Sequence, residues 1–257
     1  MLLNAEWKNV EWVFTDVDDT LTWEGKLWPE TLSALSQLQQ AGIKIVAVTG
    51  ACAGWCDHIA QLWPVNAVLG ENGAFTLEKH GNALTRRHFS TPEHQQTEQQ
   101  ILKQQIRDIL SRYPGYDFTL DQAYRLCEVA VDIGQNRPKA PQEEVDAILH
   151  DIHALGANAT ASSIHINAWY GDHSKKAASL KFIEEKGLKA DLMTKFCFSG
   201  DSANDAQMFA TFPLSVGVAN ISHYLPVLES PPAVITTQPG GLGFAEFAKA
   251  LLEIKQG

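Results

Sequence analysis

The sequence predicts an α/β fold, a mostly parallel sheet with helices on both faces, interrupted by an inserted α+β unit. Two observations support this. In the first part of the chain, short apolar segments at 10–15, 43–48 and 67–69 alternate with helical segments, which is the pattern of a parallel sheet. The same alternation returns after residue 171, whereas the segment between follows a different pattern.

The helices of the first part carry ordinary boundary signals. One begins at Pro29, a residue that suits the first turn, and ends before Gly42. Leu32 and Leu35 lie on one face of this helix, which we expect to face the core. A second helix is expected at 53–62, between the second and third strands.

The middle of the chain is expected to form a separate domain. Its segments follow the order helix, two strands, helix, strand, at 91–112, 116–120, 126–133, 141–155 and 163–169. Strands and helices then alternate again to the end, with a helix at 174–186, strands at 195–199 and 214–218, and helices at 203–210 and 242–254. We therefore predict a core domain from 1–88 and 172–257, with an α+β domain inserted at 89–171.

Composition narrows the classes of partner. The chain has 257 residues, 45% of them hydrophobic, and a formal net charge of −10. An acidic surface argues against nucleic acid or an anionic membrane as partner, but a small phosphorylated substrate remains compatible with it. We see no signal-peptide pattern and no apolar run near the roughly 20 residues of a membrane span. The four cysteines suit reduced thiols, and we expect a cytoplasmic protein. We expect it to be a monomer or a homodimer.

Two acidic clusters follow predicted strands, where ligands of such sheets bind. Asp16, Asp18 and Asp19 come directly after the first strand, and Asp201 to Asp205 after the strand at 195–199. Alone, the first could be a solvated turn and the second a capped helix start. Together they predict an all-oxygen site for a hard cation, Mg²⁺.

Two weaker signals accompany the acidic clusters. Thr49 and Gly50 follow the second strand, where a hydroxyl and backbone N–H groups could hold a phosphoryl group, although such a pair is usually only a turn. Lys175 and Lys176 stand at a predicted helix start, where the helix dipole disfavours cations. A solvated helix end is the ordinary explanation, but a nearby anion would resolve the conflict.

These segments resemble the four motifs of the haloacid dehalogenase superfamily of phosphotransferases, which has a Rossmann-like core. Asp16 to Thr20 resembles the first motif, Thr49 the second, Lys176 the third and Asp201 to Asp205 the fourth. The segments at 71–74 and 176–180 resemble the Cof-type branch, class IIB, in which a cap domain is inserted between the second and third motifs.

The resemblance implies a phosphatase for small phosphorylated metabolites, most readily sugar phosphates. Asp16 would attack phosphorus and form an aspartyl-phosphate, and Asp18 would serve as acid and base. Mg²⁺ would be held by Asp16, Asp201 and the carbonyl of Asp18. The remaining site residues would contact phosphate or substrate, or orient those that do: Thr49, Gly50, Thr20, Lys176, Asn204 and Asp205.

Two departures from the family pattern keep alternatives open. Ala51 stands where the family often has arginine, so a catalytically weak phospholigand-binding protein is one alternative. A phosphosugar mutase is another, since the same branch contains both chemistries. A carbon–halogen hydrolase is disfavoured, because it needs neither Mg²⁺ nor the second acid Asp18. The lysine motif holds two adjacent lysines, and the spacing to Leu180 favours Lys176 over Lys175.

Overall fold

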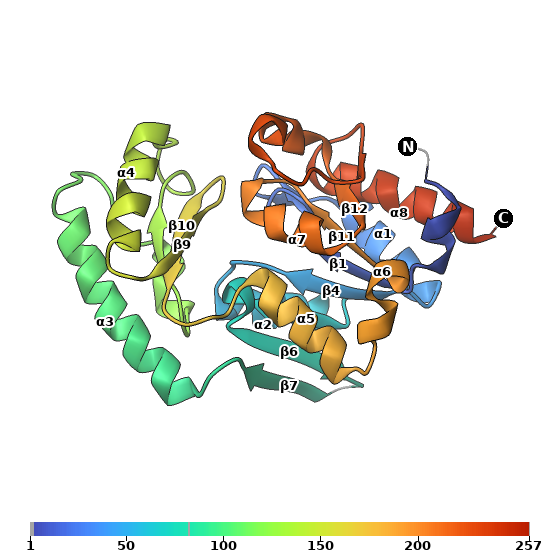
Figure 1. Ribbon diagram of the computed structural model, residues 1–257, viewed down its shortest axis with the longest axis horizontal. Helices are drawn as coiled ribbons and strands as arrows, with labels where there is room; N and C mark the ends of the chain where they lie inside the picture. Colours follow the sequence, from blue (N-terminus) through green and yellow to red (C-terminus); the bar gives the residue numbers. More distant parts are fainter. Residues whose placement is uncertain (1–2, 82, 257) are drawn as a thin grey trace.

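The computed structural model describes residues 3–81 and 83–256, and its centre is an eight-stranded sheet in the order β13-β12-β11-β1-β4-β5-β6-β7 (Figure 1). The strands are β1 (Trp12–Thr15), β4 (Lys44–Val48), β5 (Ala67–Gly70), β6 (Phe75–His80), β7 (Ala83–His88), β11 (Phe196–Gly200), β12 (Leu214–Gly217) and β13 (Val234–Ile235). The pairs from β13 to β5 are parallel, and β6 and β7 add an antiparallel hairpin. The predicted α/β fold is confirmed.

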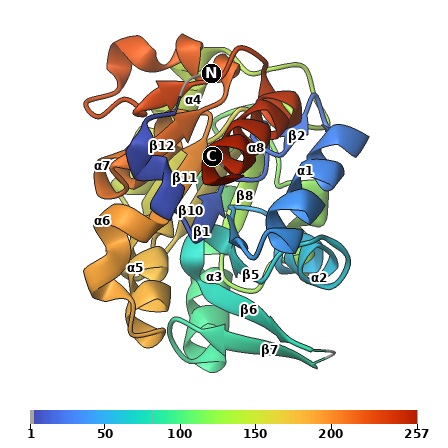
Figure 2. The same ribbon diagram turned by 90° about the vertical axis from the view of Figure 1, so that its right-hand side faces the viewer.

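Helices cover both faces of this sheet (Figure 2). One face carries α1 (Pro29–Gln40), α2 (Ala53–Leu62) and α8 (Gly240–Gln256), and the other carries α5 (Lys175–Glu185), α6 (Leu192–Lys195) and α7 (Ala206–Thr211). Strand β1 shows why both faces are covered. Val13 and Phe14 point to opposite sides, and both are completely buried.

The position of β1 determines where the polar segments meet. It lies between β4 and β11, with Phe14 opposite Val46 and Phe198. Because the three strands are parallel, the residues that follow them emerge at one edge of the sheet. Asp16, Thr49 and Asp201 each come directly after one of these strands.

A second unit lies beside the core, drawn at the left of Figure 1. It contains a three-stranded antiparallel sheet of β8 (Val129–Asp132), β10 (His165–Trp169) and β9 (Asn158–Ala161), with α3 (Pro92–Leu110) and α4 (Gln142–His153). Its apolar cluster is separate from the two of the core. This arrangement fits the inserted α+β unit, and we call it the cap; the boundaries at 88/89 and 171/172 stay predictions.

The alternation of β10 gives the cap sheet two different faces. Ile166 and Ala168 are completely buried in the cap's own apolar cluster, which also contains residues of α3 and α4. His165 and Asn167 lie between them in sequence and therefore point to the opposite face, which is turned toward the core.

Some elements differ from the sequence prediction. The hairpin of β6 and β7 was not predicted, nor was the short one of β2 (Thr22–Trp23) and β3 (Lys26–Leu27). The expected strand at 116–120 is wrong: only one bridge forms there, between Phe118 and Val131. Tyr116 and Phe118 alternate because they pack on the cap's apolar cluster, and a 3₁₀ turn, η3 (Leu120–Tyr124), follows at once. In the described part of the chain, no helix has the length and apolar character to cross a membrane.

Candidate active site

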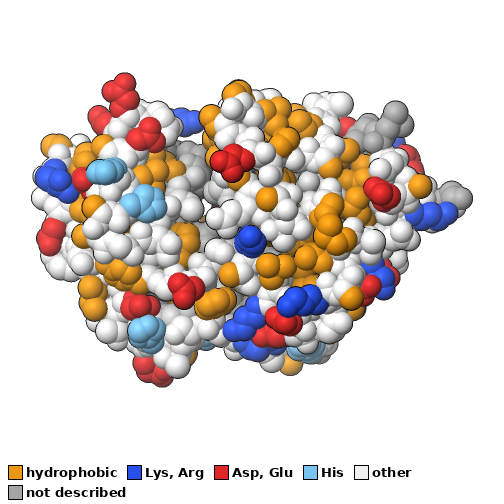
Figure 3. All heavy atoms as spheres, in the orientation of Figure 1, with side chains coloured by type: hydrophobic (Ala, Val, Ile, Leu, Met, Phe, Trp, Pro, Cys, Tyr) orange, Lys and Arg blue, Asp and Glu red, His pale blue; other side chains and the backbone are white. Residues whose placement is uncertain are grey.

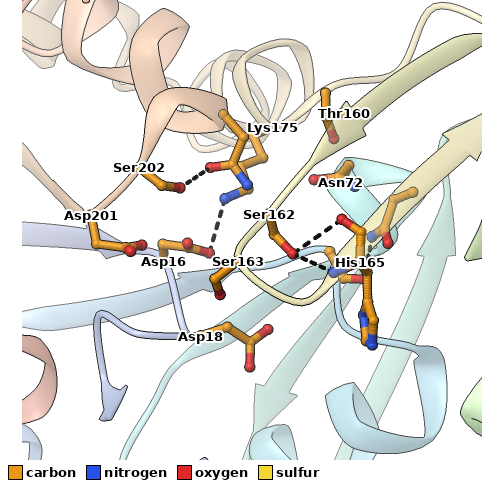
Figure 4. A pocket seen from close by; sticks show the side chains of 13 residues that line it. Asp16, Asp18, Asn72, Thr160, Ser162, Ser163, His165, Lys175, Asp201 and Ser202 are labelled. Carbon is orange, nitrogen blue, oxygen red and sulfur yellow. Dashed lines mark hydrogen bonds and ion pairs between the residues drawn. The ribbon is translucent and has the colours of Figure 1, made fainter. Parts of the chain in front are cut away.

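A narrow cavity lies between the cap and the carboxyl edge of the core sheet (Figures 3 and 4). The core contributes Asp16, Asp18, Gly50, Asn72, Lys175, Asp201, Ser202 and Asn204 to its lining, and the cap contributes Thr160, Ser162, Ser163, His165 and Asn167. The space left for the centres of water molecules is about 20 Å³. That is room for water and not for an organic molecule, so the cap must move before a metabolite can enter.

The carboxylate of Asp16 is paired with a lysine at the centre of the lining (Figure 4). Lys175 Nζ lies 2.9 Å from Asp16 Oδ1 and 2.8 Å from Asp205 Oδ1. Burial alone would lower the pKa of Lys175, but the two carboxylates raise it above its ordinary value. The lysine therefore carries a charge that neutralises part of the acidic cluster.

The structure places Lys175, and not the predicted Lys176, in the site. Lys176 is exposed to solvent, whereas the Lys175 side chain is 6% exposed. The cause is local: Ser174 caps α5 by accepting a hydrogen bond from the N–H of Ala177. This cap fixes where the helix begins and turns Lys175 toward the sheet edge.

Three buried carboxyl groups, Asp16, Asp201 and Asp205, offer oxygen atoms within 4.8 Å of one another. Burial raises the pKa of Asp16 to about 7, with Lys175 opposing the rise and Asp205 and Asp18 adding to it. Burial and Asp16 likewise raise the pKa of Asp201. Three carboxylates against one ammonium leave two negative charges, which one divalent cation would balance. An all-oxygen donor set of this kind fits Mg²⁺.

Asp201 is oriented by two further side chains. Thr20 Oγ donates to its Oδ1 at 3.1 Å, and Asn220 Nδ2 donates to its Oδ2 at 3.0 Å. Thr20 was predicted to contact substrate; it is buried behind Asp201 and is absent from the described cavity lining. Asn220 lies in a 3₁₀ turn, η6 (Ala219–His223), and no sequence pattern pointed to it.

The loop after β1 presents a second acid to the cavity. Asp18 is half-buried in the lining, and its pKa is raised by burial and by neighbouring Asp19. A raised pKa suits a group that must carry a proton at neutral pH. Asp18 is outside the carboxyl cluster, so the predicted contact of its backbone carbonyl with a metal stays a prediction.

Asp19 connects this loop to the cap. It adopts a left-handed conformation, with φ of 56°, and its Oδ2 accepts a 2.7 Å hydrogen bond from Ser163 Oγ. Its backbone carbonyl accepts another from Asn220 at 3.0 Å. The loop that carries Asp18 is therefore held from both sides when the cap is closed.

The turn after β4 brings the backbone of Gly50 close to the cap. Thr49 Oγ accepts from the N–H of Ala51 at 3.0 Å, and Gly50 lines the cavity. The carbonyl of Gly50 accepts hydrogen bonds from two cap residues, Arg125 Nη1 at 2.9 Å and Asn167 Nδ2 at 2.8 Å. A Cβ on residue 50 would lie 2.5 Å from Asn167 Nδ2, so a side chain there would displace Asn167.

A buried carboxylate ties cap and core together beside this turn. Glu71 accepts hydrogen bonds from four backbone N–H groups: Ala53 at 3.0 Å, Leu126 at 2.9 Å, Cys127 at 2.7 Å and Glu128 at 2.9 Å. The first belongs to α2 of the core and the other three to the cap. The segment at 71–74 was noted only as a family signature.

A second buried acid completes this network. Glu128 accepts from Asn72 Nδ2 at 2.8 Å and from Asn167 Nδ2 at 3.1 Å, and it lies 3.4 Å from Arg125. Burial raises the pKa of Glu128 to about 8, while Arg125 opposes the rise. The network holds Asn167, which lines the cavity from the cap, and Asn72, which lines it from the core.

Most of the predicted site residues lie in or beside the cavity. Five of them line the cavity: Asp16, Asp18, Gly50, Asp201 and Asn204. Asp205 holds Lys175, and Thr49 supports the turn next to Gly50. For the cap side of the lining, the available sequence signal was the period-two pattern of 163–169.

Comparison with known proteins agrees with this arrangement. Residues 13–113 match the haloacid dehalogenase-like hydrolase family. A phosphoglycolate phosphatase from Staphylothermus marinus is 23% identical over 250 residues, covering 93% of this chain and 96% of the relative.

Solved structures share the fold over nearly the whole chain. Thermoplasma acidophilum 0175 has a TM-score of 0.74 at 18% identity, covering 95% of this chain and 99% of the other. The sucrose-phosphatase of Synechocystis sp. PCC6803 has a TM-score of 0.66 at 13% identity, covering 95% and 98%. The subclass IIB sugar phosphatase BT4131 has a TM-score of 0.63 at 13% identity, with the same coverage. Residues 13–113 thus match the haloacid dehalogenase-like hydrolase family, and the solved structures share the fold of nearly the whole chain.

Proposed function

We propose that the protein is a Mg²⁺-dependent phosphatase that hydrolyses phosphate monoesters of small metabolites through an aspartyl-phosphate on Asp16. One observation carries the proposal: the Asp16 carboxylate lies in the lining of a narrow cavity, 2.9 Å from Lys175 and within a cluster of three carboxyl groups. The names of relatives that share the fold, a sucrose-phosphatase and a sugar phosphatase, support the choice of phosphate esters.

The carboxyl cluster is the part of the site that would hold magnesium. Asp16, Asp201 and Asp205 provide the oxygen atoms, and Thr20 and Asn220 keep Asp201 oriented. When bound, the ion supplies positive charge that lets an anionic phosphate approach an anionic carboxylate.

In the first half-reaction, a carboxylate oxygen of Asp16 attacks phosphorus, and the bond from phosphorus to the ester oxygen breaks. Asp18 lies in the same lining and gives its proton to the departing oxygen, so that an alcohol leaves. Lys175 and the N–H of Gly50 stabilise the charge on the remaining phosphoryl oxygens.

In the second half-reaction, Asp18 is a carboxylate and takes a proton from a water molecule that attacks phosphorus. The bond between phosphorus and Asp16 breaks, which releases inorganic phosphate and restores the free carboxylate. The narrow cavity limits what can enter beside the phosphoryl group, which protects the phosphoenzyme from other acceptors.

The direct test is release of inorganic phosphate from a panel of sugar and other metabolite phosphates, with Mg²⁺ and with EDTA. The Asp16→Asn variant should lose release completely, whereas Asp146→Asn, at an exposed position on α4, should retain it. Release by Asp16→Asn near the wild-type rate would overturn the covalent mechanism. A phosphorylated protein that accumulates without releasing phosphate would point to transfer to a second substrate instead.

A further inference from the structure

We infer that Asn167 selects leaving groups that carry a hydroxyl, by accepting a hydrogen bond from that hydroxyl through its side-chain oxygen Oδ1. The inference rests on the proposed phosphatase function and deepens it, since it names a residue and the chemical feature that it recognises.

The orientation of the Asn167 amide is fixed by its neighbours. Its Nδ2 lies 2.8 Å from the carbonyl oxygen of Gly50 and 3.1 Å from Oε2 of Glu128. A backbone carbonyl can only accept a hydrogen bond, so the NH₂ group must face it. Turning the amide over would set two oxygen atoms against each other. Oδ1 is therefore the atom left for another partner.

Oδ1 has no partner among the described residues and is shielded from solvent. The Asn167 residue is 7% exposed, and it belongs to the cavity lining. Buried acceptors in folded proteins are nearly always paired, so an unpaired one in a cavity wall indicates a missing donor. The cap must open to admit substrate, and a leaving group then held between cap and core would bring that donor to Asn167.

The missing donor belongs to the leaving group and not to the phosphate. Phosphate oxygens accept hydrogen bonds, so they suit Lys175 and the N–H of Gly50 and do not suit Oδ1. An aliphatic leaving group would leave Oδ1 unpaired in the closed complex. A hydroxyl supplies the proton that Oδ1 needs.

Thr160, a second side chain on the cap sheet, also lines the cavity. Thr160 on β9 pairs with Asn167 on β10 in the strand register, so both side chains stand on the same face, and both line the cavity. A threonine hydroxyl both donates and accepts hydrogen bonds, as a sugar or polyol hydroxyl does. The two residues together favour a leaving group with more than one hydroxyl.

The test compares phosphate esters of matched size with and without hydroxyls. Glycerol 3-phosphate is paired with propyl phosphate, and glucose 6-phosphate with cyclohexylmethyl phosphate, and kcat/KM is measured by phosphate release. The wild-type protein should prefer at least one hydroxylated ester over its partner by more than about 100-fold, because sites built around a hydroxyl discriminate strongly against its absence. Asn167→Leu, which is similar in size but has no acceptor, should reduce that ratio at least about tenfold.

Asn158→Leu is the matched control. Asn158 lies on β9 of the same sheet, donates to the carbonyl of Gly171 at 2.7 Å, and is exposed outside the cavity. Its replacement should leave the ratio unchanged. If Asn167→Leu does not fold, the wild-type ratios still decide the question, since equal rates within both pairs would overturn the inference.

Failure of the inference is separable from failure of the proposed function. Mg²⁺-dependent hydrolysis of p-nitrophenyl phosphate without preference within either pair would leave the phosphatase standing and refute the role of Asn167. The same refutation follows if Asn167→Leu folds and keeps the wild-type ratio. No hydrolysis of any ester would refute the phosphatase, and the inference with it.

Discussion

Nζ of Lys175 lies 2.9 Å from Oδ1 of Asp16, and this contact joins the two parts of the core that the cap separates in sequence. Asp16 follows the first strand of the sheet, whereas Lys175 begins the first helix after the cap. The position of this lysine therefore depends on how the chain returns from the cap to the core.

Replacing Lys175 with methionine should reduce kcat for phosphate release by at least about 100-fold, because the phosphoryl group would lose a buried positive charge. Lys176→Met should stay within about twofold of wild type, since Lys176 is exposed. Steady-state kinetics of the two variants checks the prediction. A large loss in Lys176→Met with little change in Lys175→Met would contradict the placement of the lysine.

The pH dependence of stability should report Asp16 when no metal is present. Folding raises the pKa of Asp16 from 3.8 to about 7, so the folded state binds its proton more tightly than the unfolded state. The resulting stabilisation is complete below about pH 4 and is lost as the pH rises toward 7. Asn at position 16 stays neutral throughout.

In EDTA, the melting temperature of Asp16→Asn relative to wild type should therefore rise between pH 5 and pH 8. Mg²⁺ should shrink this rise, because a cation stabilises the carboxylate. Thermal unfolding measured across this pH range, with Asp146→Asn as the control, decides the matter. A difference that stays constant from pH 5 to pH 8 would exclude a raised pKa at Asp16.

Magnesium itself should stabilise the folded protein at pH 7.5. A ligand at 100 times its dissociation constant adds about 2.7 kcal/mol to the free energy of unfolding. Asp201→Asn should lose most of the shift in melting temperature, since it removes one of three clustered carboxylates. Asp146→Asn should keep the full shift; equal shifts in both variants would place the ion elsewhere.

We expect the Glu71 carboxylate to contribute to the stability of the folded protein, because it joins the cap to the core. Glu71→Gln sets an NH₂ group against backbone N–H donors and leaves at least one of them unpaired. The expected loss in the free energy of unfolding is about 1–3 kcal/mol. Urea unfolding measures it, with Glu93→Gln, at an exposed position on α3, as the control. A change in Glu71→Gln no larger than in the control would show that the network does not hold the cap.

The core sheet and the acidic part of the site were predictable because both follow from short patterns. Apolar strands alternating with helices imply parallel strands, and parallel strands bring Asp16, Thr49 and Asp201 to one edge. The hairpin of β6 and β7 has a comparable signal in the sequence. Phe75 and Leu77 alternate with more polar residues, and Gly81 with a positive φ marks the turn.

Two features could not be predicted from local patterns: which of the two lysines enters the site, and which cap residues line the cavity. Moving one residue along a helix turns the side chain by about 100°, so the start of α5 decided between Lys175 and Lys176. The Ser174 cap was the relevant signal. The contacts of Glu71 with Leu126, Cys127 and Glu128 join residues 55 to 57 positions apart in the sequence, and no local pattern predicts such pairs.

The order of the strands also has a consequence for synthesis of the chain. Strand β1 is made first, yet its neighbour β11 follows the cap, and the hydroxyls of Thr15 and Ser199 that meet across the two strands are 184 residues apart. While the ribosome is still making the cap, the edge of β1 that will receive β11 has no partner. A growing chain with an open apolar strand edge is prone to aggregate, and pairings this distant form slowly. A cap that folds promptly should therefore raise the yield of native protein.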